Sequence, residues 1–138
     1  MRASIDRPLC GQNLQMLVLI VNNSIRIIER LEEIISESPS ITAIHRAYSY
    51  EEAKVLFKRN RYDIALVDIA LWKNESIQLL KDIRKTDERL CIIALFTPMD
   101  NCIYEQCKSI GVDFLLDKYY DFEKLGGLLE MHHLNDKT

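Results

Sequence analysis

The sequence predicts an α/β domain in which five parallel strands alternate with five helices. Three observations predict this class: short apolar runs recur along the chain, segments with a helical apolar period separate them, and 138 residues suit one domain. Most runs show little polar alternation, which is typical of parallel strands covered on both faces. The composition, 48% apolar and 28% charged, is that of an ordinary globular domain.

The expected strands are the apolar runs at 15–21, 42–46, 64–67, 91–96 and 114–116. Isoleucine, valine and leucine dominate most of these runs, as expected for buried strands. The second run, TAIHR, alternates apolar and polar residues instead. We therefore expect the second strand at an edge of the sheet.

Each segment between the runs carries an apolar stripe with the spacing of one helix face. In chain order the stripes are Ile28, Leu31 and Ile35; Ala53, Leu56 and Phe57; Ile77, Leu80 and Ile83; Ile103, Cys107 and Ile110; and Phe122, Leu125, Leu128 and Leu129. Ser49 and Glu52 form an S-x-x-E capping box that opens the second helix. Gly111 can end the fourth helix and Asp121 can cap the fifth.

Five strand–helix units with right-handed crossovers favour a flavodoxin-like doubly wound sheet with strand order 2-1-3-4-5. In such sheets ligands bind in the crevice at the carboxyl ends of the strands. We expect the domain over residues 14–132, between a flexible N-terminal segment at 1–13 and a C-terminal tail at 133–138.

Composition excludes several classes of function. A net charge of −3 argues against nucleic acid as a partner, because non-specific binding needs an excess of Lys and Arg. No apolar run approaches the ~20 residues of a membrane span, and the N-terminus is too polar for a signal peptide. We expect a cytoplasmic protein without a membrane partner. The four cysteines show no metal-ligand spacing and are expected to be reduced thiols: Cys10, Cys91, Cys102 and Cys107.

Polar residues follow four of the expected strands. The first strand ends at Asn22 and Asn23, the third at Asp68, the fourth at Thr97 and the fifth at Lys118. Any one of them alone is most often a turn residue. Together they place a carboxylate beside a hydroxyl and an ammonium, which is the composition of a nucleophile with an anion-binding clamp.

Five motifs in order carry a resemblance to a known family. They are LVLIV before the polar pair, YDIALVD, LLKDIR, IIALFT and GVDFLLDK. Over about residues 14–131 the chain resembles the receiver domain of bacterial response regulators. The resemblance implies that Asp68 is the phosphoacceptor, phosphorylated by a histidine kinase or a small phosphodonor. It implies that Thr97 and Lys118 contact phosphoryl oxygens.

The resemblance also implies a metal site that this chain has altered. The family has two carboxylates where Asn22 and Asn23 stand, and with the phosphoacceptor they hold Mg²⁺. Neutral amides are weaker ligands for a small, hard cation. We expect Mg²⁺ to bind weakly if at all, no other cofactor, and slow or absent phosphotransfer. With fewer anions nearby, Lys118 is expected to pair closely with Asp68. Alternatively, the two amides simply cap the first helix.

Other positions depart from the family pattern in ways that bear on switching. Trp72 and Ser76 stand where a proline and a glycine are common, so we expect a rebuilt loop after the third strand. Leu115 stands at the position of a frequent aromatic switch, which makes an aromatic rotamer switch doubtful. The Lys118–Tyr119 peptide bond can be trans, or cis at a cost of about 2.5–4 kcal/mol.

The resulting hypothesis is an atypical single-domain receiver that acts by binding and not as an enzyme, since too little sequence follows the fifth helix for an output domain. Its partner would be a sensor histidine kinase or another signalling protein. The expected partner face, which could also form a homodimer, belongs to the fourth helix, fifth strand and fifth helix: Tyr104, Gln106, Lys108, Tyr119, Tyr120 and Lys124. The alternative is a phosphorylation-competent single-domain response regulator. A flavin binder is less well supported, because the loop NNSIR lacks a glycine-rich phosphate cradle.

Overall fold

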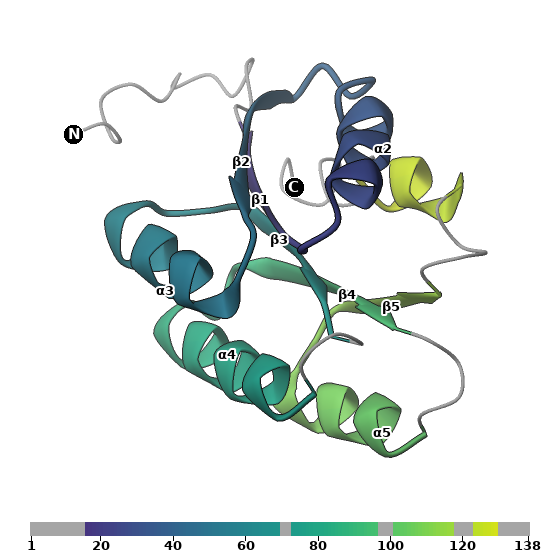
Figure 1. The fold of residues 1–138 in the computed structure, drawn as a ribbon. Helices are drawn as coiled ribbons and strands as arrows, with labels where there is room; N and C mark the ends of the chain where they lie inside the picture. Colours follow the sequence, from purple (N-terminus) through teal and green to yellow (C-terminus); the bar gives the residue numbers. More distant parts are fainter. Residues whose placement is uncertain (1–15, 70–72, 97–100, 118–122, 130–138) are drawn as a thin grey trace.

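The computed structural model describes residues 16–69, 73–96, 101–117 and 123–129, which include a five-stranded parallel sheet (Figure 1). The strand order is β2-β1-β3-β4-β5, as predicted. The strands are β1 (Met16–Val21), β2 (Ile41–Ala47), β3 (Ile64–Asp68), β4 (Cys91–Phe96) and β5 (Phe114–Asp117). Each boundary lies within one residue of its predicted position, and β2 is an edge strand as the alternation in TAIHR indicated.

Helices follow the strands in the predicted alternation. They are α2 (Ile25–Ile35), α3 (Tyr50–Arg59), α4 (Lys73–Thr86), α5 (Asn101–Ile110) and a helical segment at 123–129. Because the crossovers run to both sides, α2 and the segment 123–129 cover one face of the sheet, and α3, α4 and α5 cover the other (Figure 1). This is the flavodoxin-like doubly wound arrangement.

Two apolar cores fill the space between the sheet and its helices. The first lies under α3, α4 and α5 and includes Leu19, Val67 and Ile92 from the strands. The second lies under α2 and the segment 123–129. Its buried members are Met16, Val18, Ile20, Ile28, Leu31, Ile35, Ile64, Leu66, Cys91, Ile93, Leu95, Leu116, Leu125 and Leu129. All of β3 is buried, because the central strand is covered on both faces and both edges.

The helix signals in the sequence act as predicted. The Ser49 hydroxyl accepts the N–H of Glu52 at 3.1 Å, and the Glu52 carboxylate accepts the N–H of Tyr48 at 2.7 Å. Gly111 ends α5 with φ +99°, and its N–H donates to the carbonyl of Cys107 at 3.2 Å. Asp121 and Phe122 lie outside the described residues.

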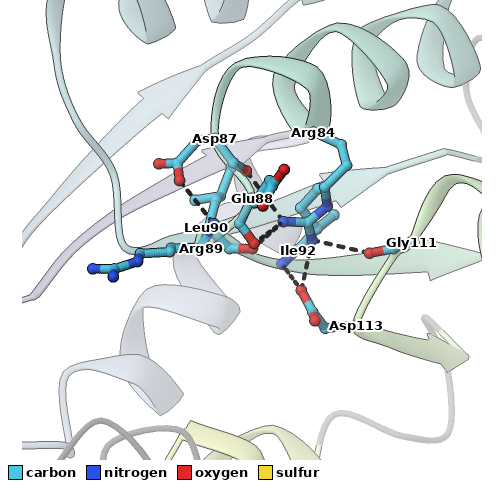
Figure 2. Close-up of polar contacts among 8 residues, drawn as sticks. All are labelled: Arg84, Asp87, Glu88, Arg89, Leu90, Ile92, Gly111 and Asp113. Carbon is cyan, nitrogen blue, oxygen red and sulfur yellow. Dashed lines mark hydrogen bonds and ion pairs between the residues drawn. The ribbon is translucent and has the colours of Figure 1, made fainter.

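At the amino ends of β4 and β5, the side chain of Arg84 joins two loops (Figure 2). Figure 2 shows its guanidinium directed into a ring of oxygen atoms from the α4–β4 and α5–β5 connections. Nη1 donates to the carbonyls of Asp87, Glu88 and Leu90 at 3.2, 2.9 and 2.8 Å, and Nη2 donates to the carbonyl of Gly111 at 2.9 Å and to Asp113 Oδ2 at 2.8 Å. This cluster stabilises the end of the sheet opposite the one where Asp68 lies.

In the part of the chain that the structure describes, no helix combines the length and apolar character needed to cross a membrane.

Candidate functional site

The register of the central strands brings two predicted site residues together. Val21 of β1 pairs with Val67 of β3, so Asn22 and Asp68 follow side by side at the carboxyl ends of these strands. Asp68 is the last residue of β3 and is 0% exposed. Asn22 is 1% exposed, and its main-chain N–H donates to the carbonyl of Ala47 at 3.0 Å. The site therefore begins at the predicted edge of the sheet.

The side chains of Asn22 and Asp68 are hydrogen-bonded to each other. Asn22 Nδ2 donates to Asp68 Oδ2 at 2.9 Å. Asn22 Oδ1 accepts the main-chain N–H of Ser24 at 2.9 Å. These two bonds determine the orientation of the amide, because a main-chain N–H requires the oxygen and the carboxylate requires the nitrogen. A buried carboxylate is costly without such partners, and Asn22 supplies one.

The amides do not cap the first helix, which was the alternative interpretation of the Asn pair. The N-cap of α2 is Ser24, whose hydroxyl accepts the N–H of Ile27 at 3.4 Å. Asn22 fixes the turn into the helix through its bond to the Ser24 N–H. Asn23 is exposed. The two asparagines therefore differ in environment, and only Asn22 contacts Asp68 through a hydrogen bond that the structure records.

Two hydroxyl side chains that the sequence analysis did not assign to the site hold the main chain around Asp68. Tyr50, the first residue of α3, donates its hydroxyl to the carbonyl of Asp68 at 2.7 Å. Ser76, in the first turns of α4, donates to the carbonyl of Ile69 at 3.4 Å. Burial raises the pKa of the Tyr50 hydroxyl well above its ordinary value; a hydrogen bond with Ser76 opposes this, and the charges of Asp68 and Glu75 add to it.

Several predicted site residues lie outside the described residues. They include Thr97 and Lys118, which directly follow β4 and β5 in the sequence. The expected pairing of Lys118 with Asp68 stays a prediction, as does the conformation of the Lys118–Tyr119 bond. Trp72 and Tyr120 also lie in undescribed segments.

The described residues of the expected switch and partner face come from α5, β5 and the segment 123–129. Leu115 is half-buried and packs against the first core. Tyr104 of α5 lies over Phe96 with ring centroids 5.9 Å apart, and Lys108 Nζ lies 5.3 Å from the centre of the Tyr104 ring. The side chains of Gln106, Lys108 and Lys124 on that face are exposed. Tyr119 is outside the described residues, so that part of the face is not placed.

Among residues 16–69, 73–96, 101–117 and 123–129, no group of three or more His, Cys, Asp or Glu side chains is arranged to hold a metal ion. Among these residues, the Asn22 amide is a hydrogen-bond partner of the Asp68 carboxylate.

Comparison with known proteins agrees with this fold. The sequence profile of the response regulator receiver domain matches residues 18–130. The receiver domain of Francisella response regulator 1452 is 21% identical over 88% of this chain and 99% of that one, with a TM-score of 0.75.

Two other solved structures are similar at the same level. A response regulator from Thermotoga maritima is 18% identical over 87% of this chain and 98% of that one, with a TM-score of 0.76. The chemotaxis protein CheY4 of Vibrio cholerae is 20% identical over 85% of this chain and 98% of that one, with a TM-score of 0.72. At such identities the structures show the shared fold. The match to the family profile over most of the chain shows that this protein belongs to the response regulator receiver domain family and is a receiver domain of two-component signalling.

Proposed function

We propose that this receiver acts as a protein-interaction module in two-component signalling, with weak or absent Mg²⁺-dependent phosphorylation. The observation that carries the proposal is the 2.9 Å hydrogen bond from the Asn22 amide to Asp68 Oδ2. This bond gives the buried carboxylate a neutral partner. Phosphoryl transfer to a carboxylate instead requires a cation that neutralises the charge of the approaching phosphoryl group. The receiver then acts by binding a partner and not as an enzyme.

The donor atoms around Asp68 fit Mg²⁺ poorly. Magnesium requires oxygen ligands in near-octahedral geometry and favours carboxylates. Asn22 directs its nitrogen toward Asp68, and its oxygen already accepts the Ser24 N–H. Rotating the amide to offer the oxygen would break both hydrogen bonds. Asn23 is neutral, so it adds no charge that would compensate for this loss.

An aspartate in place of Asn22 would reverse the electrostatics. Its carboxylate oxygen would lie near the position of Nδ2, which is 2.9 Å from Asp68 Oδ2. Two carboxylates at this separation repel unless a cation or a shared proton lies between them. The aspartate would therefore create a requirement for a cation that the asparagine removes.

We propose a sensor histidine kinase or another cytoplasmic signalling protein as the partner. The proposed docking surface surrounds β5 and includes Tyr104, Gln106, Lys108 and Lys124, of which the last three are exposed. A homodimer through this surface is part of the same proposal. The net charge of −3 supports a protein partner over nucleic acid.

Phosphorylation with acetyl phosphate and Mg²⁺, followed by intact-mass measurement, tests the proposal. Wild type is compared with Asn22→Asp/Asn23→Asp and with the same double variant carrying Asp68→Asn. We expect a phosphoryl mass increment in the double variant alone. A stable, Asp68-dependent increment in wild type would instead establish the phosphorylation-competent alternative. That alternative is favoured by one observation, the presence of Asp68 at the end of β3.

A further inference from the structure

We propose that Tyr50 and Ser76 form a pair of hydroxyl groups that positions the phosphoacceptor, by holding the main chain where β3 leaves the sheet. The two residues come from the starts of different helices, α3 and α4. Their hydroxyls donate to the carbonyls of two consecutive residues, Asp68 and Ile69. Both are positioning residues, since they act on Asp68 through its backbone.

The main chain at this point is held from both sides. Tyr50 donates to the Asp68 carbonyl at 2.7 Å, and Ser76 donates to the Ile69 carbonyl at 3.4 Å. On the other side, the N–H of Ile69 donates to the carbonyl of Leu95 in β4 at 3.0 Å. Because the peptide groups after Asp68 are fixed by these bonds, the direction in which its side chain leaves the backbone is fixed as well.

Tyr50 is built for this contact and not for the helix surface. It is 5% exposed, and its ring belongs to the first core beneath α3, α4 and α5. A buried tyrosine hydroxyl needs a hydrogen-bond partner, and here it donates its proton to the carbonyl of the phosphoacceptor itself. Burial raises the pKa of this hydroxyl well above the ordinary value, so it keeps its proton to donate in the pH range in which the protein works.

The arrangement links two helices to the site. A shift of α3 or α4 relative to the sheet has to lengthen one of these hydrogen bonds or carry the Asp68 backbone with it. Ser76 is also 0% exposed, so solvent does not replace the lost partner without local opening. The hydrogen bond between Asp68 and Asn22 therefore depends on the side chains of Tyr50 and Ser76, although no recorded hydrogen bond joins either of them to Asn22.

A purely structural role for a buried hydroxyl makes a different prediction, and Tyr62 offers the matched control. It is 3% exposed and belongs to the same core. Its hydroxyl is 2.7 Å from His45 Nδ1 and 3.3 Å from Asn60 Nδ2, at the amino end of β3. Tyr62→Phe removes a buried hydroxyl as Tyr50→Phe does, but far from Asp68.

Nuclear magnetic resonance on otherwise wild-type protein tests the proposal without any phosphorylation. The readouts are the side-chain amide signals of Asn22 and the hydrogen exchange of the Ile69 amide. We expect Tyr50→Phe to shift the Asn22 signals and speed Ile69 exchange by about tenfold, the effect of losing one hydrogen bond. Ser76→Ala is expected to act in the same direction. Tyr62→Phe is expected to leave both readouts unchanged, even where it lowers the melting temperature as much.

A second arm measures function and rests on the proposed function. In the Asn22→Asp/Asn23→Asp background, Tyr50→Phe is expected to slow phosphorylation by acetyl phosphate about tenfold, because the nucleophile is less well placed. Tyr62→Phe is expected to leave the phosphorylation rate within about twofold, because it also removes a buried hydroxyl but does not displace Asp68. If the background variant takes up no phosphoryl group, the two amides are not what prevents phosphorylation in the proposed function, and the magnetic resonance arm still tests the positioning role. Equal changes in the Asn22 and Ile69 signals from Tyr50→Phe and Tyr62→Phe, or none from either, would overturn the positioning role.

Discussion

Asp63 and Asp113 occupy equivalent places in two different strand–helix units. Each directly precedes a strand, and each carboxylate accepts a main-chain N–H from the neighbouring strand at 2.8 Å, Leu17 for Asp63 and Ile92 for Asp113. Both carboxylates thus satisfy an N–H at the start of a strand. At Asp113 the same oxygen also pairs with Arg84 at 2.8 Å, which ties the α5–β5 turn to α4.

The first prediction concerns Arg84. We expect Arg84→Lys to lower the free energy of unfolding by about 2–4 kcal/mol, because lysine cannot reach the carbonyls and the carboxylate at once. Arg89→Lys is the control, since that exposed side chain points away from the cluster (Figure 2), and it is expected to change stability by less than about 0.5 kcal/mol. Urea unfolding followed by circular dichroism measures both. Equal effects would contradict the assigned role of the guanidinium.

Two glycines are expected to respond to alanine with opposite signs. Gly111 has φ +99°, and an added Cβ would meet Arg84 Nε at an ordinary 3.7 Å, so its cost comes from the backbone conformation alone. Gly111→Ala is expected to lower stability by about 1–2 kcal/mol. Gly126 is helical with nothing within 4 Å of its Cβ position, so Gly126→Ala is expected to raise stability by about 0.5–1 kcal/mol. Thermal melts of the two variants separate these outcomes; shifts of the same sign would rule out this account.

The ion pair between Glu32 and Arg46 makes stability depend on pH. The hydrogen bond from Arg46 holds the pKa of Glu32 below its ordinary 4.5, against a smaller opposing effect of burial. A carboxyl group with a lowered folded-state pKa stabilises the protein above its unfolded-state pKa, and the effect disappears as the pH falls through the folded value. We expect the melting-temperature difference between wild type and Glu32→Gln to vanish in that acidic range.

A double-mutant cycle is the control for this pH effect. In an Arg46→Gln background, Glu32→Gln is expected to show no comparable pH-dependent difference, because the partner that lowers the pKa is gone. Persistence of the full pH-dependent difference in that background would assign it to another charge.

The buried thiols are expected to be protected in the folded protein. Burial raises the pKa of Cys107 from 9.0 to about 11, which lowers the thiolate fraction at mildly alkaline pH by roughly a hundredfold. Cys91 is buried as well. In a Cys10→Ser/Cys102→Ser variant, a disulfide reagent should modify the two remaining thiols only slowly until denaturant is added. Rapid modification of the native variant would contradict this protection.

The strands and their order could be predicted because each leaves a local pattern. Apolar runs predicted the strands, and the polar residues that follow four of these runs predicted the edge of the sheet where Asp68 lies. Asp68 and Asn22 were predicted to converge for this reason, and the pairing of Val21 with Val67 brings them together. The sequence left open whether the two amides stand at an altered metal site or cap the first helix, because this depends on the turn of the backbone after β1. The hydrogen bond from Asn22 to Asp68 was not predicted.

Tyr50 and Arg84 were missed for different physical reasons. Tyr50 stands inside a capping box, where a first-turn residue is commonly exposed, and its burial depends on how α3 packs across the end of β3. Arg84 lies in a charged helix end that would suit solvent, but four of its acceptors are main-chain carbonyls, which every residue has. Neither contact has a signature in residue type or spacing.

The second core has a consequence for how the chain folds during its synthesis. Val18 and Ile20 are among the first described residues to emerge from the ribosome, whereas Leu125 and Leu129, which complete the same core, are among the last. The sheet can therefore pair before one of its faces is sealed. Until the segment 123–129 is made, the nascent domain presents part of an apolar face to chaperones and neighbouring chains, and premature termination before Leu125 would leave that face open.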